Sequence, residues 1–145
     1  MNEKQFFERI FRLVNLYNAK TKQPRTFSTG HTLHSAETHA IEIIGSSEGI
    51  TSTQLAKSLS VTKGAVSQTT SKLISKELAG KRLSEDGSTI LLYLKPDGVT
   101  IYNEHRRLHE KMLSEISGLT AQIPSETKEL LLKIADTIES ELELL

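Results

Sequence analysis

The chain has 145 residues, a length that fits one domain with a core of its own. Its 18 Lys and Arg balance its 18 Asp and Glu, so no global basic field attracts nucleic acid. The sequence holds no cysteine, which excludes disulfides and leaves His and carboxylates as the ligands for any metal. Charges at Glu8, Arg9 and Arg12 interrupt the apolar N-terminal run, so we expect no signal peptide, no membrane partner and a cytoplasmic protein.

The first predicted helix, residues 3–20, carries apolar residues on more than one of its faces. A helix that is apolar on two sides usually packs against something beyond its own domain, most simply a second subunit. We therefore predict a homodimer whose dimerisation helices are about 1–30 and 97–145, with burial inside the monomer as the plainer alternative. The expected dimer contacts are Phe6, Phe7, Ile10, Phe11, Ile134, Ile138 and Leu142.

Residues 20–30 turn polar and contain Pro24 and Gly30, which predicts a loop. A second helix is expected at about 35–44, ending at Gly45, and a short link follows it. The stretch from 51 to 78 then predicts a helix-turn-helix. Thr51 and Gln54 have the spacing of a capping box, and Thr62 can cap the second of the two helices.

The second helix of this pair is predicted to bury one apolar stripe, formed by Ala65, Val66, Thr69, Leu73 and Ile74. Its opposite face carries short donors and acceptors between cations, the mix that base edges and phosphates need. An ordinary solvated helix is the alternative interpretation. The candidate DNA contacts are Thr51, Ser52, Thr62, Lys63, Gly64, Ser67, Gln68, Ser71, Lys72, Lys81 and Arg82.

Charge is unevenly distributed although it balances overall. Between residues 57 and 82 there are six cations and one acid, whereas residues 125–145 hold two Lys and six acids. A local basic surface of this kind is compatible with docking on phosphates through one face.

A two-stranded hairpin is predicted next, with strands at about 79–84 and 89–95 and a tight turn at Asp86-Gly87. A basic hairpin directly after a recognition helix is typical of a wing, which reaches an adjacent minor groove or the backbone. Pro96 then begins a helix to about residue 119, and a last helix follows Pro124. The predicted fold is one mainly α domain, 1–145, with a winged helix-turn-helix at about 33–96 and a small β-hairpin as its wing.

This order of elements resembles the MarR family of bacterial and archaeal transcriptional regulators over nearly the whole chain. The residues that carry the resemblance are Gln54-Leu55-Ala56, Leu59-Ser60-Val61-Thr62, Ala65-Val66-Ser67 and Lys72-Leu73. It implies a winged-helix homodimer that binds double-stranded DNA at a pseudo-palindromic operator, with an affinity that a ligand changes. Two departures are Asp86-Gly87-Ser88, where the family's wing commonly has Asp-x-Arg, and Leu94-Lys95, where the family commonly has Leu-Thr.

The five histidines fall into two groups in the sequence. His31, His34 and His39 surround the second predicted helix, and His105 and His109 lie on the fifth. Because His105 and His109 are four residues apart, they share one helix face, as a zinc site requires. Structural or solvated histidines are the alternative interpretation of a helix-borne pair.

The zinc-sensing branch of the MarR family is similar at His39, His105 and His109. That branch takes a further ligand from an acid in the loop after the first helix, and no acid lies between Arg9 and Glu37 here. His31, His34 and Glu37 are candidate replacements. The resemblance therefore makes Zn²⁺ the candidate cofactor, with absence of any metal left open.

Two other functions compete with a zinc-controlled regulator. An organic effector can bind between the same helices, with Tyr17, His34, Ile41 or Tyr102 as lining, or the winged helix can serve as a protein-interaction module without DNA contact. A duplex-binding assay separates the second, because phosphate contacts impose a steep salt dependence. We do not expect an enzyme, because no Ser-His-acid set, phosphate loop or carboxylate pair has usable spacing.

Overall fold

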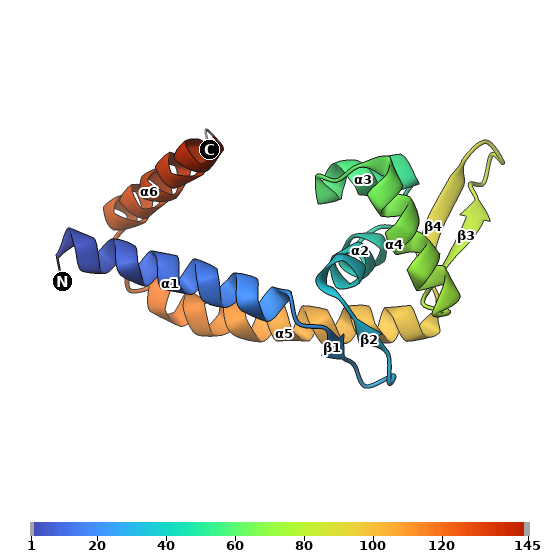
Figure 1. Cartoon of the computed structure of the whole chain (residues 1–145), viewed down its shortest axis with the longest axis horizontal. Coiled ribbons are helices and arrows are strands. Elements are labelled where there is room, and N and C mark those ends of the chain that lie inside the picture. Colours follow the sequence, from blue (N-terminus) through green and yellow to red (C-terminus); the bar gives the residue numbers. More distant parts are fainter. Residues whose placement is uncertain (1, 144–145) are drawn as a thin grey trace. The chain divides into compact units, whose positions relative to one another are not determined.

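The structure is a computed structural model that describes residues 2–143, without the side chains at positions 3, 21, 142 and 143. The chain divides into two compact units, Met1–Arg106 and Arg107–Leu145, each described here by itself. The predicted dimer contact Leu142 lies outside the described side chains. The elements, shown in Figure 1, are α1 (Glu3–Thr21), β1 (Arg25–Thr26), β2 (Thr32–Leu33), α2 (Ser35–Gly45), α3 (Ser52–Leu59), α4 (Lys63–Ser75), β3 (Ala79–Leu83), β4 (Ile90–Leu94), α5 (Pro96–Thr120) and α6 (Ser125–Glu143).

The predicted mainly α fold with a small hairpin wing is confirmed. The loop predicted for residues 20–30 is wrong in one respect, because β1 pairs antiparallel with β2. The hydroxyls of Thr26 and Thr32 are 2.8 Å apart across this pair, and Phe27, 3% exposed, anchors it in the core. Two-residue strands are too short to show a period of two, so the sequence pattern gave no sign of them.

Caps define the helix-turn-helix as the sequence predicted. The Thr51 hydroxyl accepts a hydrogen bond from the Gln54 N–H at 3.1 Å, and the Gln54 side chain accepts one from the Thr51 N–H at 2.9 Å. Ser60 ends α3 in the left-handed conformation at φ 53°. The Thr62 hydroxyl then accepts from the Ala65 N–H and starts α4. The turn between the helices is therefore fixed by local hydrogen bonds.

The predicted buried stripe of α4 is partly wrong. Val66 and Leu73 are buried as expected, but Ala65 is exposed and Thr70 is buried in its place. The Thr70 hydroxyl donates to the Val66 carbonyl at 2.9 Å, so burying it leaves no donor unsatisfied. The stripe is thus rotated toward Thr70, which turns Ala65 toward solvent.

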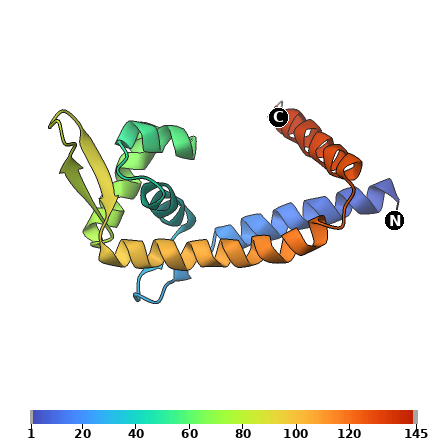
Figure 2. The same cartoon turned by 180° about the vertical axis from the view of Figure 1, so that it is seen from behind.

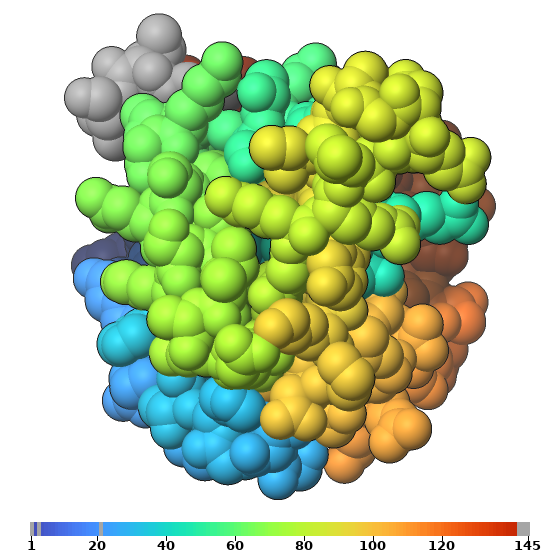
Figure 3. All heavy atoms as spheres, turned by 90° about the vertical axis from the view of Figure 1, so that its right-hand side faces the viewer, coloured from blue at the N-terminus to red at the C-terminus, as the bar shows by residue number. Residues whose placement is uncertain are grey.

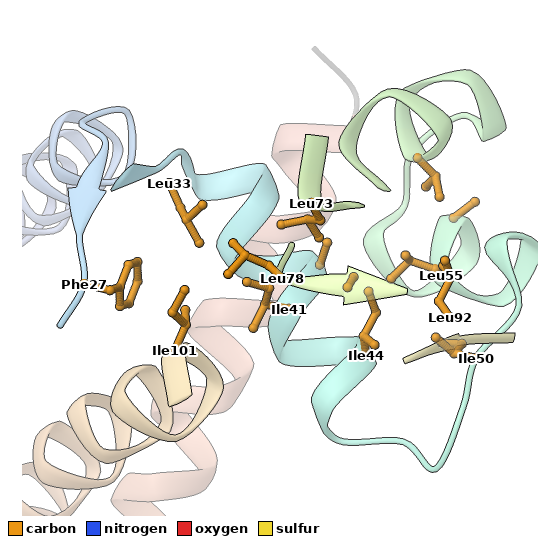
Figure 4. Packing of buried hydrophobic residues seen from close by; sticks show 14 residues of the cluster. Phe27, Leu33, Ile41, Ile44, Ile50, Leu55, Leu73, Leu78, Leu92 and Ile101 are labelled. Carbon is orange, nitrogen blue, oxygen red and sulfur yellow. The ribbon is translucent and has the colours of Figure 1, made fainter. Parts of the chain in front are cut away.

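One hydrophobic cluster joins α2, α3, α4, the wing strands and the start of α5. Its fully buried side chains come from segments far apart in the sequence, as Figure 4 shows. They include Leu33, Ile41, Ile44, Leu55, Val66, Leu73, Leu78, Leu92 and Ile101. Because both helices of the helix-turn-helix contribute to this cluster, it fixes α4 relative to α2 and the wing.

The wing is the hairpin of β3 and β4, in register from Ala79↔Leu94 to Leu83↔Ile90. It lies beside α4 in both views of the chain (Figures 1 and 2). At its base, α5 packs tightly against the entry to β3: a Cβ added at Gly98 would lie 2.0 Å from the Leu78 carbonyl oxygen. A larger residue at 98 therefore has to push the two segments apart.

The second unit consists of the later part of α5 and of α6. Many of its large apolar side chains are exposed, among them Leu113, Leu119, Leu130 and Leu132. Ile134 and Ile138, predicted as dimer contacts, are half-buried. Within the described residues, no helix has the length and apolar character needed to cross a membrane.

Candidate nucleic-acid interface and effector site

The outward face of α4 is the candidate DNA-reading surface. Figure 3 shows α4 and the wing on one face of the molecule. All six residues that the sequence predicted for this face are exposed, namely Lys63, Gly64, Ser67, Gln68, Ser71 and Lys72. Cations thus stand near both ends of a row of short polar side chains, the arrangement that lets phosphates position a helix and base edges contact its middle.

The hydroxyls of Thr51 and Thr62 serve another purpose in this structure. Both cap helices, as described above, and Ser52 is the exposed first residue of α3. The N-termini of α3 and α4 present backbone N–H groups and the positive end of a helix dipole, which favour phosphate oxygens. These three residues therefore mark helix N-termini at which a DNA backbone can be held.

The wing carries its cations at the base and acids at its tip. Lys81 and Arg82 are both exposed, but an Arg82 Nη donates a hydrogen bond to the Glu48 carbonyl, and the Arg82 guanidinium lies 5.7 Å from the centre of the Tyr93 ring. No Lys or Arg occurs from residue 83 to 94. In the turn, Asp86 accepts from Ser84 and Ser88, and these hydrogen bonds lower the pKa of the Asp86 carboxyl to about 2.

The C-terminal end of α4 is held by an ion pair that the sequence did not reveal. Lys76 Nζ lies 2.7 Å from Glu37 Oε1 and donates to the Thr32 carbonyl at 3.0 Å. Glu37, 3% exposed, also accepts from the His34 N–H at 3.0 Å and so caps α2. Burial alone would raise the pKa of the Glu37 carboxyl, but the hydrogen bonds from Lys76 and His34 outweigh it and the pKa is lowered.

Both oxygens of Glu37 thus have partners within the protein, although the sequence made Glu37 a candidate metal ligand. The signal that could have identified its partner is weak, because residues 37 and 76 are 39 apart. Contacts over such distances have no local pattern. The structure gives Glu37 the task of joining α2 and β2 to the end of α4.

Of the remaining candidate ligands, His105 has a charged neighbour within the first unit. His105 Nε2 is 3.7 Å from Glu42 Oε2, which links α5 to α2 within the first unit, and the His105 side chain is 12% exposed. His39 is half-buried and His34 is exposed. His109 belongs to the second unit. Across the described part of the chain, no three His, Asp or Glu side chains form a group that could hold a metal ion.

A second contact fixes the β1–β2 hairpin on α5. Glu104 Oε2 accepts from the Ser28 N–H at 3.0 Å and from the Ser28 hydroxyl at 2.8 Å. These hydrogen bonds, together with the charge of Arg25, lower the pKa of the Glu104 carboxyl. Sequence reasoning missed this role because the contact spans 76 residues.

A cavity of about 340 Å³ lies between the end of α2, the wing base and the start of α5. Its lining combines apolar side chains with Arg82, Glu48 and Asn103, and the rings of Tyr93 and Tyr102. Tyr102 was a predicted lining residue for an organic effector. Ile41, predicted beside it, is fully buried in the core instead.

The sequence model of the MarR family matches residues 33–86, which contain α2, the helix-turn-helix, all of β3 and part of the wing turn. No curated protein sequence matches the chain.

Solved structures resemble the chain over nearly its full length. ZitR of Lactococcus lactis in complex with DNA is 21% identical, with a TM-score of 0.77, and the match covers 98% of this chain and 99% of that one. A structure of L. lactis ZitR described as a zinc-responsive MarR family member is 20% identical, with a TM-score of 0.74, and the match covers 97% of this chain and 99% of that one. The adhesin competence repressor AdcR of Streptococcus pyogenes is 20% identical, with a TM-score of 0.76, and the match covers 94% of this chain and 96% of that one. At these identities the likeness establishes the fold.

Proposed function

We propose that the chain is a MarR-type, DNA-binding transcriptional regulator that acts as a homodimer on a pseudo-palindromic operator, because the MarR family model matches residues 33–86. The observation that carries the proposal is the exposed polar face of α4, with Lys63 and Lys72 near its two ends and the wing beside it. In this function the protein is no enzyme.

In the proposed complex, α4 enters the major groove. Ser67, Gln68 and Ser71 face base edges, where a Gln can pair with adenine in a bidentate manner. Lys63 and Lys72 hold phosphates on either side. Since the opposite face of α4 is bound into the core through Val66 and Leu73, the helix approaches DNA as a rigid element.

A homodimer supplies the second recognition helix, one helical turn of DNA away. Support comes from α1, where Phe7 and Phe11 are exposed, Phe11 by 63%, and Phe6 and Ile10 are half-buried. In the second unit, exposed leucines of α5 and α6 form further apolar surface. Apolar surface of this extent is the usual mark of a protein–protein interface.

Binding to duplexes selected from a random pool tests the proposal. A steep fall of affinity with salt is expected, because each phosphate contact releases a counterion. Gln68→Ala should lower the affinity for the selected sequence about 5- to 150-fold while leaving non-specific binding unchanged. Gln122→Ala, a matched change in the turn after α5, should have no effect. Absence of salt-dependent binding to any duplex would instead favour the protein-interaction module.

Effector control is the finer part of the proposal, with Zn²⁺ as the candidate. By chemistry, the imidazoles of His39, His105 and His109 suit zinc. Among the described residues, the structure shows no group of three such side chains. The support is the likeness to a zinc-responsive MarR family member.

Metal analysis of protein purified without a histidine tag, with operator titration before and after chelation, tests zinc control. Zinc in the protein and an affinity that falls with chelator are expected. An unchanged affinity and no bound metal would leave an organic effector in the 340 Å³ cavity beside Tyr102 as the candidate. The double variant His105→Ala, His109→Ala should abolish the chelator response.

A further inference from the structure

Arg82 stands at the centre of a contact that spans the wing. Its Nη donates to the carbonyl oxygen of Glu48 at 2.5 Å, and its guanidinium lies 5.7 Å from the centre of the Tyr93 ring. Tyr93 in turn lies flat against β3, where a Cβ added at Gly80 would be 2.6 Å from the ring. The guanidinium therefore rests on an aromatic ring that is itself fixed against backbone.

The carbonyl that Arg82 reaches belongs to the link between α2 and α3. Two residues further on, Ile50 pairs with Leu92 by two backbone hydrogen bonds of 3.3 and 2.8 Å. The link thus lies along one edge of β4, and β3 lies along the other. From β3, the Arg82 side chain crosses β4 to reach the link, and so joins three consecutive backbones of the wing base.

Lys81 and Arg82 point to opposite faces of β3, because successive side chains of a strand alternate. Arg82 shares its face with Tyr93 and the link. Lys81 is exposed on the other face, on the strand that contacts α4. Two adjacent cations that look alike in the sequence are therefore placed for different tasks.

We infer that Arg82 is a positioning residue, which fixes the wing against the α2–α3 link, and that it is no phosphate contact. This inference rests on the proposed DNA-binding function. Because the link ends at Thr51, the cap of α3, Arg82 sets where the wing stands relative to the helix-turn-helix. The wing tip holds no cation that could anchor it on DNA from the far end, so its position depends on its base.

The test compares Arg82→Gln, Arg82→Lys and Lys81→Gln on a selected duplex over a range of salt concentrations. For Lys81→Gln, we expect the slope of log K against log salt to fall in magnitude by about 0.9 per subunit, as for a lost phosphate contact. Both Arg82 variants should lose affinity on the order of ten-fold and keep the wild-type slope, because neither removes a phosphate contact; a slope lowered in Arg82→Gln as in Lys81→Gln would show that Arg82 contacts a phosphate. Lysine keeps the charge but lacks the planar fork that lies over Tyr93 and reaches Glu48.

Amide hydrogen exchange in the protein without DNA gives a second readout. Exchange at Ile50 and Leu92 should accelerate in both Arg82 variants and stay unchanged in Lys81→Gln, with circular dichroism verifying that each variant is folded. The inference is wrong if Arg82→Lys binds like wild type, or if exchange at these amides does not change. If the wild type binds no duplex, the proposed function fails, and hydrogen exchange still decides whether Arg82 holds the wing.

Discussion

Glu37 is the buried partner of Lys76, and replacing it by Gln removes the negative charge while keeping the shape of the side chain. Lys76 Nζ then retains the Thr32 carbonyl at 3.0 Å but faces an amide where a carboxylate lay at 2.7 Å. Since Glu37 is 3% exposed and Lys76 closes α4, the change weakens the connection between the recognition helix and α2. We predict a less stable protein with a less well-fixed α4.

The size of the effect follows from burial on each side of the pair. Breaking a fully buried ion pair costs about 3–5 kcal/mol, because it leaves an unpaired buried charge. The Lys76 side chain is 33% exposed, so water partly replaces the lost partner. An amide oxygen at position 37 can still accept one hydrogen bond. We therefore expect the free energy of unfolding to fall by about 2 kcal/mol, and Tm by about 4–8 °C.

Thermal and urea unfolding of wild type, Glu37→Gln, Lys76→Met and the double variant measure this effect. The double-mutant cycle should give a coupling energy of at least about 1 kcal/mol. Glu77→Gln is the matched control, because Glu77 pairs with Lys95 on the surface of the same turn with its side chain 76% exposed, and it should leave Tm unchanged. A Glu37→Gln loss no larger than that of the control would refute the assigned role.

The pH dependence gives an independent check on the same pair. The pKa of the Glu37 carboxyl is lowered in the folded protein, so its stabilising contribution is present above the unfolded-state pKa of about 4.3. It is lost as pH falls below that value and through the folded-state pKa. The difference in free energy of unfolding between wild type and Glu37→Gln should therefore be constant from pH 7 to 5 and shrink below about pH 4.

Gly98→Ala should destabilise the protein, because the new Cβ would lie 2.0 Å from the Leu78 carbonyl oxygen. A thermal scan measures the fall in Tm, and an unchanged Tm would show that α5 can move away from Leu78. Asp86→Asn should keep the wing turn, since the amide oxygen still accepts from Ser84 and Ser88, whereas Asp86→Ala should speed amide exchange at Ser88. Equal exchange in the two variants would contradict this reasoning. Phe7→Ser with Phe11→Ser should convert the proposed dimer to monomer in light scattering, and a dimer that persists would place the interface elsewhere.

Local chemistry made the helices of this chain predictable. The Thr51–Gln54 capping box, the Thr62 cap and the Pro96 start each act within a few residues, so the predicted boundaries agree with the structure closely. The exposed face of α4 was likewise predictable from the period of the helix. Thr70 was left out of the predicted buried stripe because its hydroxyl bonds back to its own helix, which a polarity pattern does not show.

Contacts between distant segments could not be predicted in the same way. The partner of Glu37 is 39 residues away and that of Arg82 is 34 residues away, and neither distance leaves a period or spacing in the sequence. Both residues had been assigned to ligands outside the protein, a metal for Glu37 and DNA for Arg82. In the structure, each is bound to another part of the chain, so a charged residue in a functional segment need not face the ligand.

Whether a cation is bound within the protein or exposed also determines how strongly residues 57–82 can make DNA affinity depend on salt. Residues 57–82 hold six cations, but Lys76 is paired with Glu37 and Arg82 is bound to Glu48. The exposed cations left to contact phosphates are Lys57, Lys63, Lys72 and Lys81. Each phosphate contact contributes about −0.9 to the slope of log K against log salt concentration. Four lysines in each of two subunits can therefore contribute about −7, compared with about −11 if all six cations of each segment contacted DNA. Neutralising the four lysines together should therefore remove the segment's whole contribution; a slope that stays steep after that change would mean that Lys76 or Arg82 leaves its partner on binding.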